Sequence, residues 1–519
     1  MWRILCKALL AAVLVTAVAA PLEVHAGEQD AMPLSAAPAP FRSGDNDEEY
    51  GRLLQQSRDA ALAAPLSDRA NLLYRQAAAV VEVRHDLARE WANELFALAL
   101  QMKGSARTRF QEEAVEVLCR ADPDRALELL HNITAEDAAP GVITSPFAPG
   151  STMVARQVFD AIARRDGLSA LPALEREADR MGLQGRYPYE AVGFSARLML
   201  SKAEKQQKLE VLSSVFDLTF TRYTQQPRTF TDDFQFGMML NALAPLPDDK
   251  LMPAVRAVVK NLLALDTHKY QFQLEVYTYD GQVAHAYNPI DASILYLLAN
   301  LLNRDPDLTQ QLQDSRPELR ATLEYARNRQ IRQMGFHGGG PPENQPEESV
   351  TIELDAVRVS RSNPDAGIAL TEKLSADDGS RSGARLSIAR TIAGDQPQKA
   401  ADLIAGVVAA AGQSPSDGLM LNILAAQGYL AASQGRLDDL HMFVQRGFDV
   451  AKRVLAAQPE SNVSPRGLQA LVRIGIQNDP GLTAAFLQSV PPGAMKAELL
   501  LVAAVALRGE RLPGTSTPK

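Results

Sequence analysis

The sequence is poor in cysteine, with two in 519 residues. Cys6 lies in an N-terminal segment with the pattern of a secretion signal, so removal of this segment would leave Cys119 as the single cysteine. A single thiol excludes an internal disulfide. An exported chain without disulfides depends on its hydrophobic core, and a chain of this length can form an extensive one.

Histidine pairs and phosphate-binding loops are also missing from the sequence. The seven histidines include no two that are three or four residues apart, the spacing that places two metal ligands on one helix face. Three glycines at 338–340 are followed by two prolines, which prevents a nucleotide-binding helix from starting there. Apolar residues surround Cys119, so we expect a buried side chain rather than a nucleophile. The sequence therefore predicts no catalytic residue, no metal ion and no cofactor.

The chain has no excess of basic residues. Lys and Arg number 53 against 62 Asp and Glu, and the formal net charge is −9. A protein that binds nucleic acid needs a dense basic face, and the sequence contains no Lys/Arg cluster that would form one. Nucleic acid is therefore not an expected partner.

The first 26 residues predict export. Arg3 and Lys7 precede an apolar run from Ala8 to Ala20, which is shorter than the roughly 20 residues that a membrane-spanning helix needs. Small residues at Val24 and Ala26 suit signal peptidase. We expect cleavage between Ala26 and Gly27, a periplasmic or secreted mature protein, and no integral membrane anchor in the mature chain.

Much of the remaining chain has helical periodicity, punctuated by Asp or Asn followed by Pro. An Asp or Asn side chain can cap a new helix, and Pro fits the first helical turn because its missing N–H has no partner there. This punctuation predicts helix starts and short connections between helices. The dipeptides are Asp122-Pro123, Asp305-Pro306, Asn363-Pro364 and Asp479-Pro480.

Three pairs of short segments resemble each other in two parts of the chain. Their members are 195, 188 and 181 residues apart, a drift that loop shortening in a duplicated array would leave. Chance matches among common residues would explain them as well. The pairs are 159–162 with 354–357, 196–198 with 384–386, and 237–241 with 418–422.

Helix pairs of roughly 30–45 residues resemble the α-solenoid class of helical repeats, either tetratricopeptide-like or HEAT-like. The resemblance covers 48–508 and implies an all-α fold, a superhelical array of antiparallel helix hairpins. The expected parts are a signal peptide at 1–26, a disordered tether at 27–47, N-terminal hairpins at 48–137, a first repeat half at 138–334, a flexible linker at 335–349, a second repeat half at 350–508 and a disordered tail at 509–519.

One stretch departs from helical spacing. Apolar and polar residues alternate from Tyr270 to Tyr277, and Asp280-Gly281 then precedes a second apolar segment. Alternation followed by Asp-Gly is typical of a β-hairpin. We therefore expect a small hairpin inserted among the helices near 270–287.

The expected hairpin carries the candidate binding residues Tyr277, Tyr279, His285 and Tyr287. Tyrosine and histidine together can transfer protons in the elimination of a glycosidic bond from an acidic polysaccharide. Tyrosines are also common strand residues, and the histidine can be an exposed polar side chain. A cleft that gathers these residues with arginines would favour an enzyme, and their dispersal would favour a scaffold.

These patterns favour an exported, non-catalytic helical-repeat scaffold for protein-protein or protein-peptide interaction. Its partner would be a protein or peptide, because the exposed faces of such repeats bind extended partners. The alternative is a polysaccharide-active enzyme, a lyase or hydrolase, on a helical scaffold. A third hypothesis is an envelope-structural protein that works by self-association.

Overall fold

The computed structural model describes residues 45–134, 151–200, 204–225, 229–265, 272–278, 283–328, 331–338, 348–376, 379–413, 415–457 and 465–509. These residues form two compact units. Unit 1 comprises the described residues of 1–79 and 344–519, and unit 2 those of 80–343. The contacts thus divide the chain near residues 79 and 343, whereas the sequence places its divisions at 138, 335 and 350. The predicted signal peptide lies outside the described residues, and the first helix begins at Asp45, inside the predicted tether.

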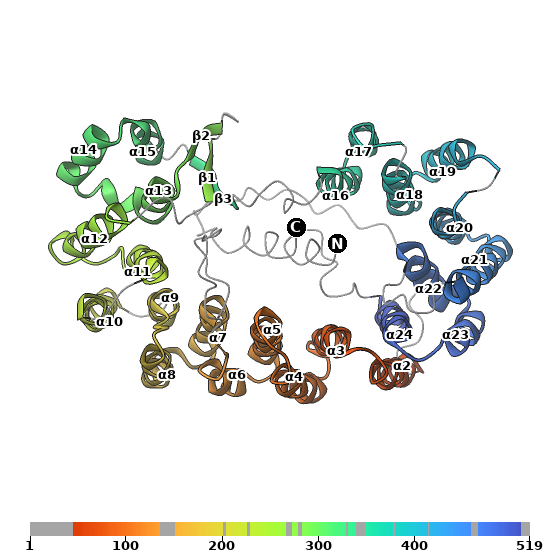
Figure 1. Ribbon diagram of the computed structural model, residues 1–519, viewed down its shortest axis with the longest axis horizontal. Coiled ribbons are helices and arrows are strands. Elements are labelled where there is room, and N and C mark those ends of the chain that lie inside the picture. The colour runs from red at the N-terminus through yellow and green to blue at the C-terminus, as the bar shows by residue number, and fades with distance from the viewer. Residues whose placement is uncertain are drawn as a thin grey trace. The chain divides into compact units, whose positions relative to one another are not determined.

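Both units are predominantly helical, which confirms the coarse all-α prediction and is compatible with the helical-repeat class (Figure 1). Unit 2 contains α4 (His85–Ala99), α5 (Ser105–Ala121), α6 (Pro123–Leu130), α7 (Ser151–Asp166), η1 (Gly167–Ala170), α8 (Leu171–Leu183), α9 (Tyr189–Met199), α10 (Lys205–Gln225), α11 (Phe230–Ala242), α12 (Asp248–Leu263), β1 (Phe272–Thr278), β2 (Val283–Tyr287), α13 (Pro289–Leu302), α14 (Pro306–Ser315), η3 (Pro317–Leu319), α15 (Arg320–Arg327) and β3 (Ile331–Gly338).

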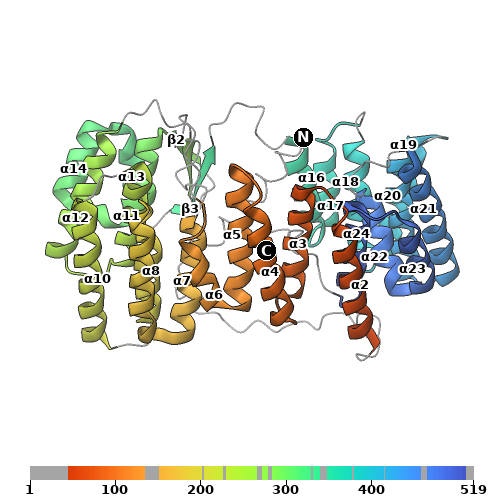
Figure 2. The same ribbon diagram turned by 60° about the horizontal axis from the view of Figure 1, so that its bottom comes forward.

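Unit 1 combines the first described helices with the last ones. It contains α2 (Asp45–Ala61), α3 (Leu66–Val80), α16 (Glu348–Ser360), α17 (Pro364–Thr371), α18 (Ser380–Ile392), α19 (Pro397–Ala411), α20 (Asp417–Ser433), α21 (Leu437–Ala457), α22 (Arg466–Asn478), α23 (Pro480–Ser489) and α24 (Ala494–Leu507). Figure 2 shows the helices of each unit standing side by side as columns.

The Asp-Pro and Asn-Pro dipeptides start helices, as predicted. The side chains of Asp122, Asp305, Asn363 and Asp479 accept hydrogen bonds from backbone N–H groups three residues later, at 3.1 to 3.2 Å. In each case the following proline is the first helical residue, of α6, α14, α17 and α23 respectively. The helix starts are therefore encoded locally.

Within each unit the helices form two layers (Figure 1). Each helix of one layer packs against the helix that comes two places later in the chain, as α7 does with α9 and α18 with α20. We call layer A the helices α5, α7, α9, α11 and α13 of unit 2, and α16, α18, α20, α22 and α24 of unit 1. The intervening helices form layer B. Alternation of this kind is what stacked helix hairpins produce.

The similar sequence segments occupy equivalent layer A helices in the two units. Those near 160, 197 and 239 lie in α7, α9 and α11, and their counterparts lie in α16, α18 and α20. Asp305 and Asp479, the caps of α14 and α23, continue the falling series of offsets with a separation of 174 residues. The shared helix order supports a duplicated array.

Glycines allow neighbouring helices of layer A to approach closely. A Cβ atom at Gly467 would lie 2.6 Å from the backbone nitrogen of Asn422, so α22 could not keep this distance from α20 with any larger residue. Gly237 has a similar role in unit 2, where a Cβ atom would lie 2.8 Å from a methyl group of Leu297.

The last helix of unit 1 is covered by the first. α24 is apolar around most of its circumference, and it packs against α2, α22 and α23. The Ser57 hydroxyl donates to the Ala497 carbonyl at 2.6 Å, and Arg75 pairs with Glu498 at 2.6 Å. α24 is thus buried between elements from both ends of the chain.

The three strands of unit 2 form one sheet in the order β2-β1-β3. β1 pairs antiparallel with β2 over the stretch where the sequence alternates, and antiparallel with β3 from Phe272 opposite Gly338 to Thr278 opposite Ile331. The sequence pattern gives no sign of β3, whose last four residues fall in the predicted linker 335–349. Three α-helices separate β3 from β2 in the chain, so β3 forms because it pairs with β1 in the folded protein and not because a local turn brings it there.

Candidate binding site

Three of the four candidate residues named from the sequence lie in the sheet of unit 2. Tyr277 is in β1 opposite Val283, whereas Tyr287 is in β2 opposite Leu274, so the two tyrosines are at different ends of the β1–β2 pairing. His285 is also in β2, and Tyr279 lies outside the described residues. A binding role for these four residues stays a prediction.

A more complete arrangement lies on layer A of unit 1, which is strongly curved. Glu353 of α16 forms an ion pair with Arg466 of α22 at 2.8 Å. Two helices, α18 and α20, lie between them in the layer. Neighbouring packed helices are 8–10 Å apart, so three steps across a flat layer would cover about 24–30 Å. A glutamate and an arginine cannot span that distance, and the layer must therefore curve toward the face that bears them.

Arg390 of α18 lies on this curved face and is partly exposed. Its guanidinium donates to the Ser387 hydroxyl at 2.9 Å and to the Asn422 side-chain oxygen at 3.5 Å. Burial lowers the pKa of Arg390, with opposing effects from Tyr429 and Glu353 and a further lowering by Arg466. Arg390 therefore has neutral hydrogen-bond acceptors and a cationic neighbour.

The hydroxyl group of Tyr429 in α20 is influenced by the positive charges of two arginines, Arg473 and Arg390. Burial raises the pKa of its hydroxyl above the usual value, and Arg473 and Arg390 oppose this effect without reversing it. The hydroxyl thus keeps its proton at neutral pH. Tyr429 can donate a hydrogen bond to a ligand, but it is not prepared to act as a base.

Arg473 of α22 completes the cluster, which we call the arginine–tyrosine site: Arg390, Tyr429 and Arg473. Within the described part of the chain, neither arginine has a carboxylate at ion-pair distance. Glu353 is occupied by Arg466 at the edge of the site. The arrangement presents donors and positive charge on a curved surface of a protein whose net charge is −9.

Layer A of unit 2 carries a second charged cluster, in which the cation is already compensated. Arg156 pairs with Glu190 at 2.5 Å, lies 3.9 Å from Asp160, and stacks over the Phe194 ring at 4.0 Å. Burial raises the pKa of Glu190 and of Asp160. Arg156 is compensated by these two carboxylates, so this cluster is better explained as a structural link between α7 and α9.

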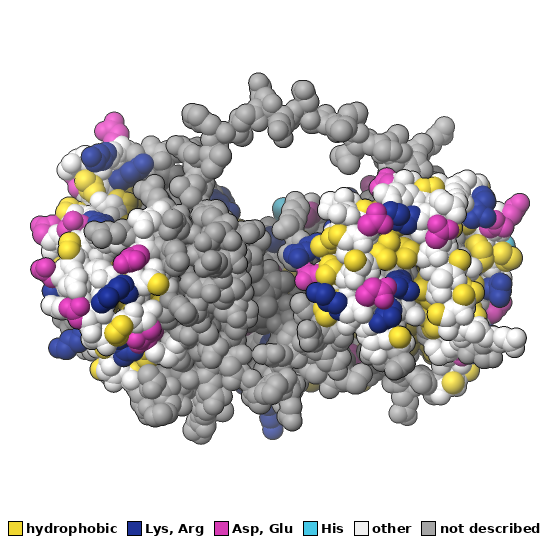
Figure 3. Space-filling view, turned by 90° about the horizontal axis from the view of Figure 1, so that it is seen from above, with side chains coloured by type: hydrophobic (Ala, Val, Ile, Leu, Met, Phe, Trp, Pro, Cys, Tyr) yellow, Lys and Arg dark blue, Asp and Glu magenta, His cyan; other side chains and the backbone are white. Residues whose placement is uncertain are grey.

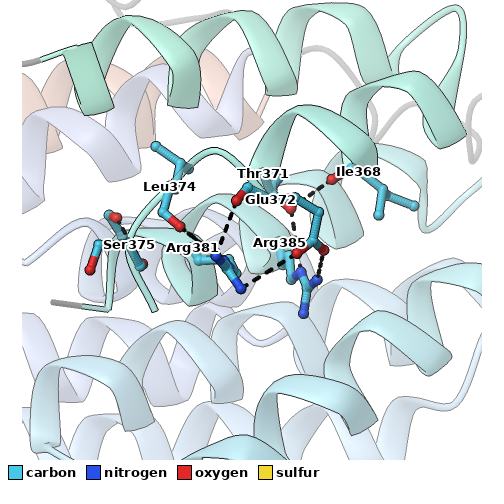
Figure 4. A network of polar contacts seen from close by, with 8 residues as sticks. Ile368, Thr371, Glu372, Leu374, Ser375, Arg381 and Arg385 are labelled. Carbon is cyan, nitrogen blue, oxygen red and sulfur yellow. Dashed lines mark hydrogen bonds and ion pairs between the residues drawn. The ribbon is translucent and has the colours of Figure 1, made fainter. Parts of the chain in front are cut away.

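A third polar network joins the end of α17 to the start of α18 (Figure 4). Arg381 donates to the Leu374 carbonyl at 2.8 Å, and Arg385 contacts both Thr371 and Glu372. Arg381 thus satisfies backbone carbonyl groups just beyond the end of α17, while Arg385 binds two side chains at that end. The network fixes the connection between the two helices, and its arginines pair with Glu372 of the same network.

The pocket beside this network, between α17, α18 and α19, is also lined by paired charges. Lys399 pairs with Asp365 at 2.9 Å, and Ile368 and Leu403 provide apolar surface. Figure 3 shows hydrophobic side chains between charged ones on this side of unit 1. The cations of this pocket pair with carboxylates, unlike those of the arginine–tyrosine site.

The described residues lack two features that bear on the kind of site. They contain no group of three or more His, Cys, Asp or Glu side chains placed to share a metal ion. None of the helices they form has the length and apolar character that crossing a bilayer requires.

The sequence matches no protein-family model and no curated protein.

Sequence reasoning missed the arginine–tyrosine site for a simple reason. Arg390, Tyr429 and Arg473 are 39 and 44 residues apart, and no local motif connects them. A repeat of about 40 residues would bring such positions onto one face, but the repeat becomes readable only when the helices are aligned in the structure.

Proposed function

We propose that the protein is an exported helical-repeat scaffold, a superhelical array whose curved face in unit 1 binds an extended segment of another protein. The observation that carries this proposal is the ion pair between Glu353 and Arg466, which requires layer A to curve around α18 and α20. A curved face that presents side chains from successive helices suits an extended chain. The leader at 1–26 supports a partner in the periplasm or outside the cell.

The enzyme alternative has less support at this site. Elimination of a glycosidic bond needs a group that removes a proton, and such a group has a pKa tuned toward the working pH. The pKa of Tyr429 is shifted upward instead. A donor that stays protonated favours ligand binding.

Site-specific photocrosslinking in the native host tests the scaffold. Ala470 of α22 is partly exposed and lies one turn from both Arg466 and Arg473, so a benzoylphenylalanine there faces the curved surface. Ala409 on the exposed side of α19 in layer B is the matched control. We expect one crosslinked protein from position 470 and none from 409. Equal products from both positions, or no product from 470, would contradict the proposal.

Export has its own test. Mass spectrometry of the protein recovered from the envelope fraction should give a mature chain that begins at Gly27. Recovery of the chain with residues 1–26 still attached would contradict export by cleavage.

A further inference from the structure

The arginine–tyrosine site is rich in hydrogen-bond donors. A guanidinium has five N–H groups in a planar fork, and Arg390 uses two of its contacts on Ser387 and Asn422. Arg473 makes no hydrogen bond within the described part of the chain, and Tyr429 keeps its hydroxyl proton. A ligand that completes this site must supply acceptors.

The positive charge of the site favours ligands whose hydrogen-bond acceptors are anionic. Arg390, Arg473 and the neighbouring Arg466 carry three positive charges, against the single negative charge of Glu353. Arg390 and Arg473 are partly buried, which weakens the screening of their charges by water, so an anionic ligand gains more here than at an exposed surface. Planar carboxylates match the fork of a guanidinium and can accept two hydrogen bonds from it.

The arrangement of the helices favours an extended ligand. The three residues come from α18, α20 and α22, which lie next to one another in layer A. In an extended peptide, alternate side chains point to the same side and repeat at about 6.6–6.8 Å. Acidic residues at alternate positions can therefore meet donors from neighbouring helices of a curved layer.

We propose that Arg390, Tyr429 and Arg473 form a subsite for carboxylate side chains, and that the bound segment is an extended acidic peptide. This inference rests on the scaffold function proposed above and adds the chemistry of the partner. Arg390 and Arg473 bind the carboxylates, and the Tyr429 hydroxyl donates a further hydrogen bond. The ion pair between Glu353 and Arg466 borders the subsite.

Fluorescence anisotropy with the full mature chain tests the subsite. The probe is a labelled eight-residue peptide with Glu at alternate positions, compared with the same peptide carrying Gln. We expect the Glu peptide to bind at least about tenfold more tightly, and its affinity to fall as salt is raised. Equal affinity of the two peptides would overturn the assignment.

Variants of the protein show which residues give the preference for the Glu peptide. Arg473→Gln and Arg390→Gln should each weaken binding of the Glu peptide about tenfold and leave the Gln peptide unaffected. Tyr429→Phe keeps the ring and should cause a smaller loss, while circular dichroism confirms that each variant is folded. Arg453→Gln is the matched control, because it removes an exposed arginine of the layer B helix α21, whose partner Asp417 lies at the start of α20. Loss of selectivity in the control alone, or unchanged affinity in Arg473→Gln, would refute the subsite.

Two comparisons separate this inference from the scaffold function. If position 470 crosslinks a protein but the Glu peptide has no advantage, the scaffold stands and the acidic subsite is wrong. If an oligogalacturonate of matched charge binds more tightly than the Glu peptide and depends on the same arginines, the carboxylates belong to a glycan and the peptide assignment is wrong.

Discussion

Asp305 is expected to stabilise unit 2 more than any cap that acts alone, because it has two roles. Its side chain is 6 % exposed and accepts from the Leu308 N–H at 3.1 Å, which caps α14. It also accepts two hydrogen bonds from Arg256 of α12, both at 2.7 Å. Asp122 caps α6 in the same way, but its arginine contact is longer, at 3.6 Å to Arg89, and more exposed.

The expected magnitudes follow from these contacts. Loss of a cap costs about 1 kcal/mol. The two charge-assisted bonds add about 1–2 kcal/mol, a value reduced because Arg256 is 48 % exposed. Asp305→Ala should therefore destabilise the fold by about 2–3 kcal/mol and Asp122→Ala by about 1 kcal/mol. Asp305→Asn keeps the cap and should lose about 1 kcal/mol, the contribution of the charge.

Native-state hydrogen exchange is the suitable assay, since a chain with two units need not unfold in one step. The protection of the amides in α14 should fall in the order wild type, Asp305→Asn, Asp305→Ala. The amides of α6 provide the corresponding measurement for Asp122→Ala. A loss in Asp305→Ala no larger than that in Asp122→Ala would refute the reasoning, since the Arg256 contact would then contribute nothing. A double-mutant cycle with Arg256→Ala should give a coupling energy of about 1 kcal/mol.

Three further predictions concern other parts of the protein. Burial raises the pKa of Glu113 to about 7 from 4.5, so its contribution to stability is full below about pH 4.5 and is lost as pH rises through 7. As the pH is raised from about 5 to about 8, the thermal stability of Glu113→Gln should therefore fall less than that of the wild type. The same fall in both proteins would contradict this prediction. Burial also raises the pKa of Cys119 to about 12, so the mature native protein should resist a chromogenic thiol reagent near pH 8 and react once unfolded. Ser57→Ala removes the bond to Ala497 and the acceptor of the Gln76 amide, and should cost about 1–3 kcal/mol, visible as faster exchange in α24. Unchanged exchange in α24 would show that this contact between α2 and α24 contributes little.

The starts of many helices could be predicted from the sequence because capping is local. Asp479 acts on an N–H group three residues away, and the proline after it needs no partner from elsewhere. Helical periodicity is local in the same sense. The predominance of helix and the alternation of short helices therefore followed from the residues themselves.

The candidate site could not be predicted in this way. The sequence directed attention to Tyr277 and His285 because tyrosine and histidine are chemically conspicuous. Arg390 and Arg473 are two of many arginines, and they gain significance only because, among the described residues, neither of them forms an ion pair with a carboxylate. Whether a charge is compensated is a property of the folded surface.

Distant contacts were decided by the tertiary structure as well. The sequence by itself determined the helices, the positions of their caps and the stripes of apolar residues, since each depends on residues within one or two turns. The tertiary structure decided that α2 covers α24, with Ser57 and Ala497 in contact across 440 residues, and that Glu353 meets Arg466. Such contacts depend on how successive helix pairs rotate against one another, and small rotations accumulate over a stack into a curvature that local sequence does not encode.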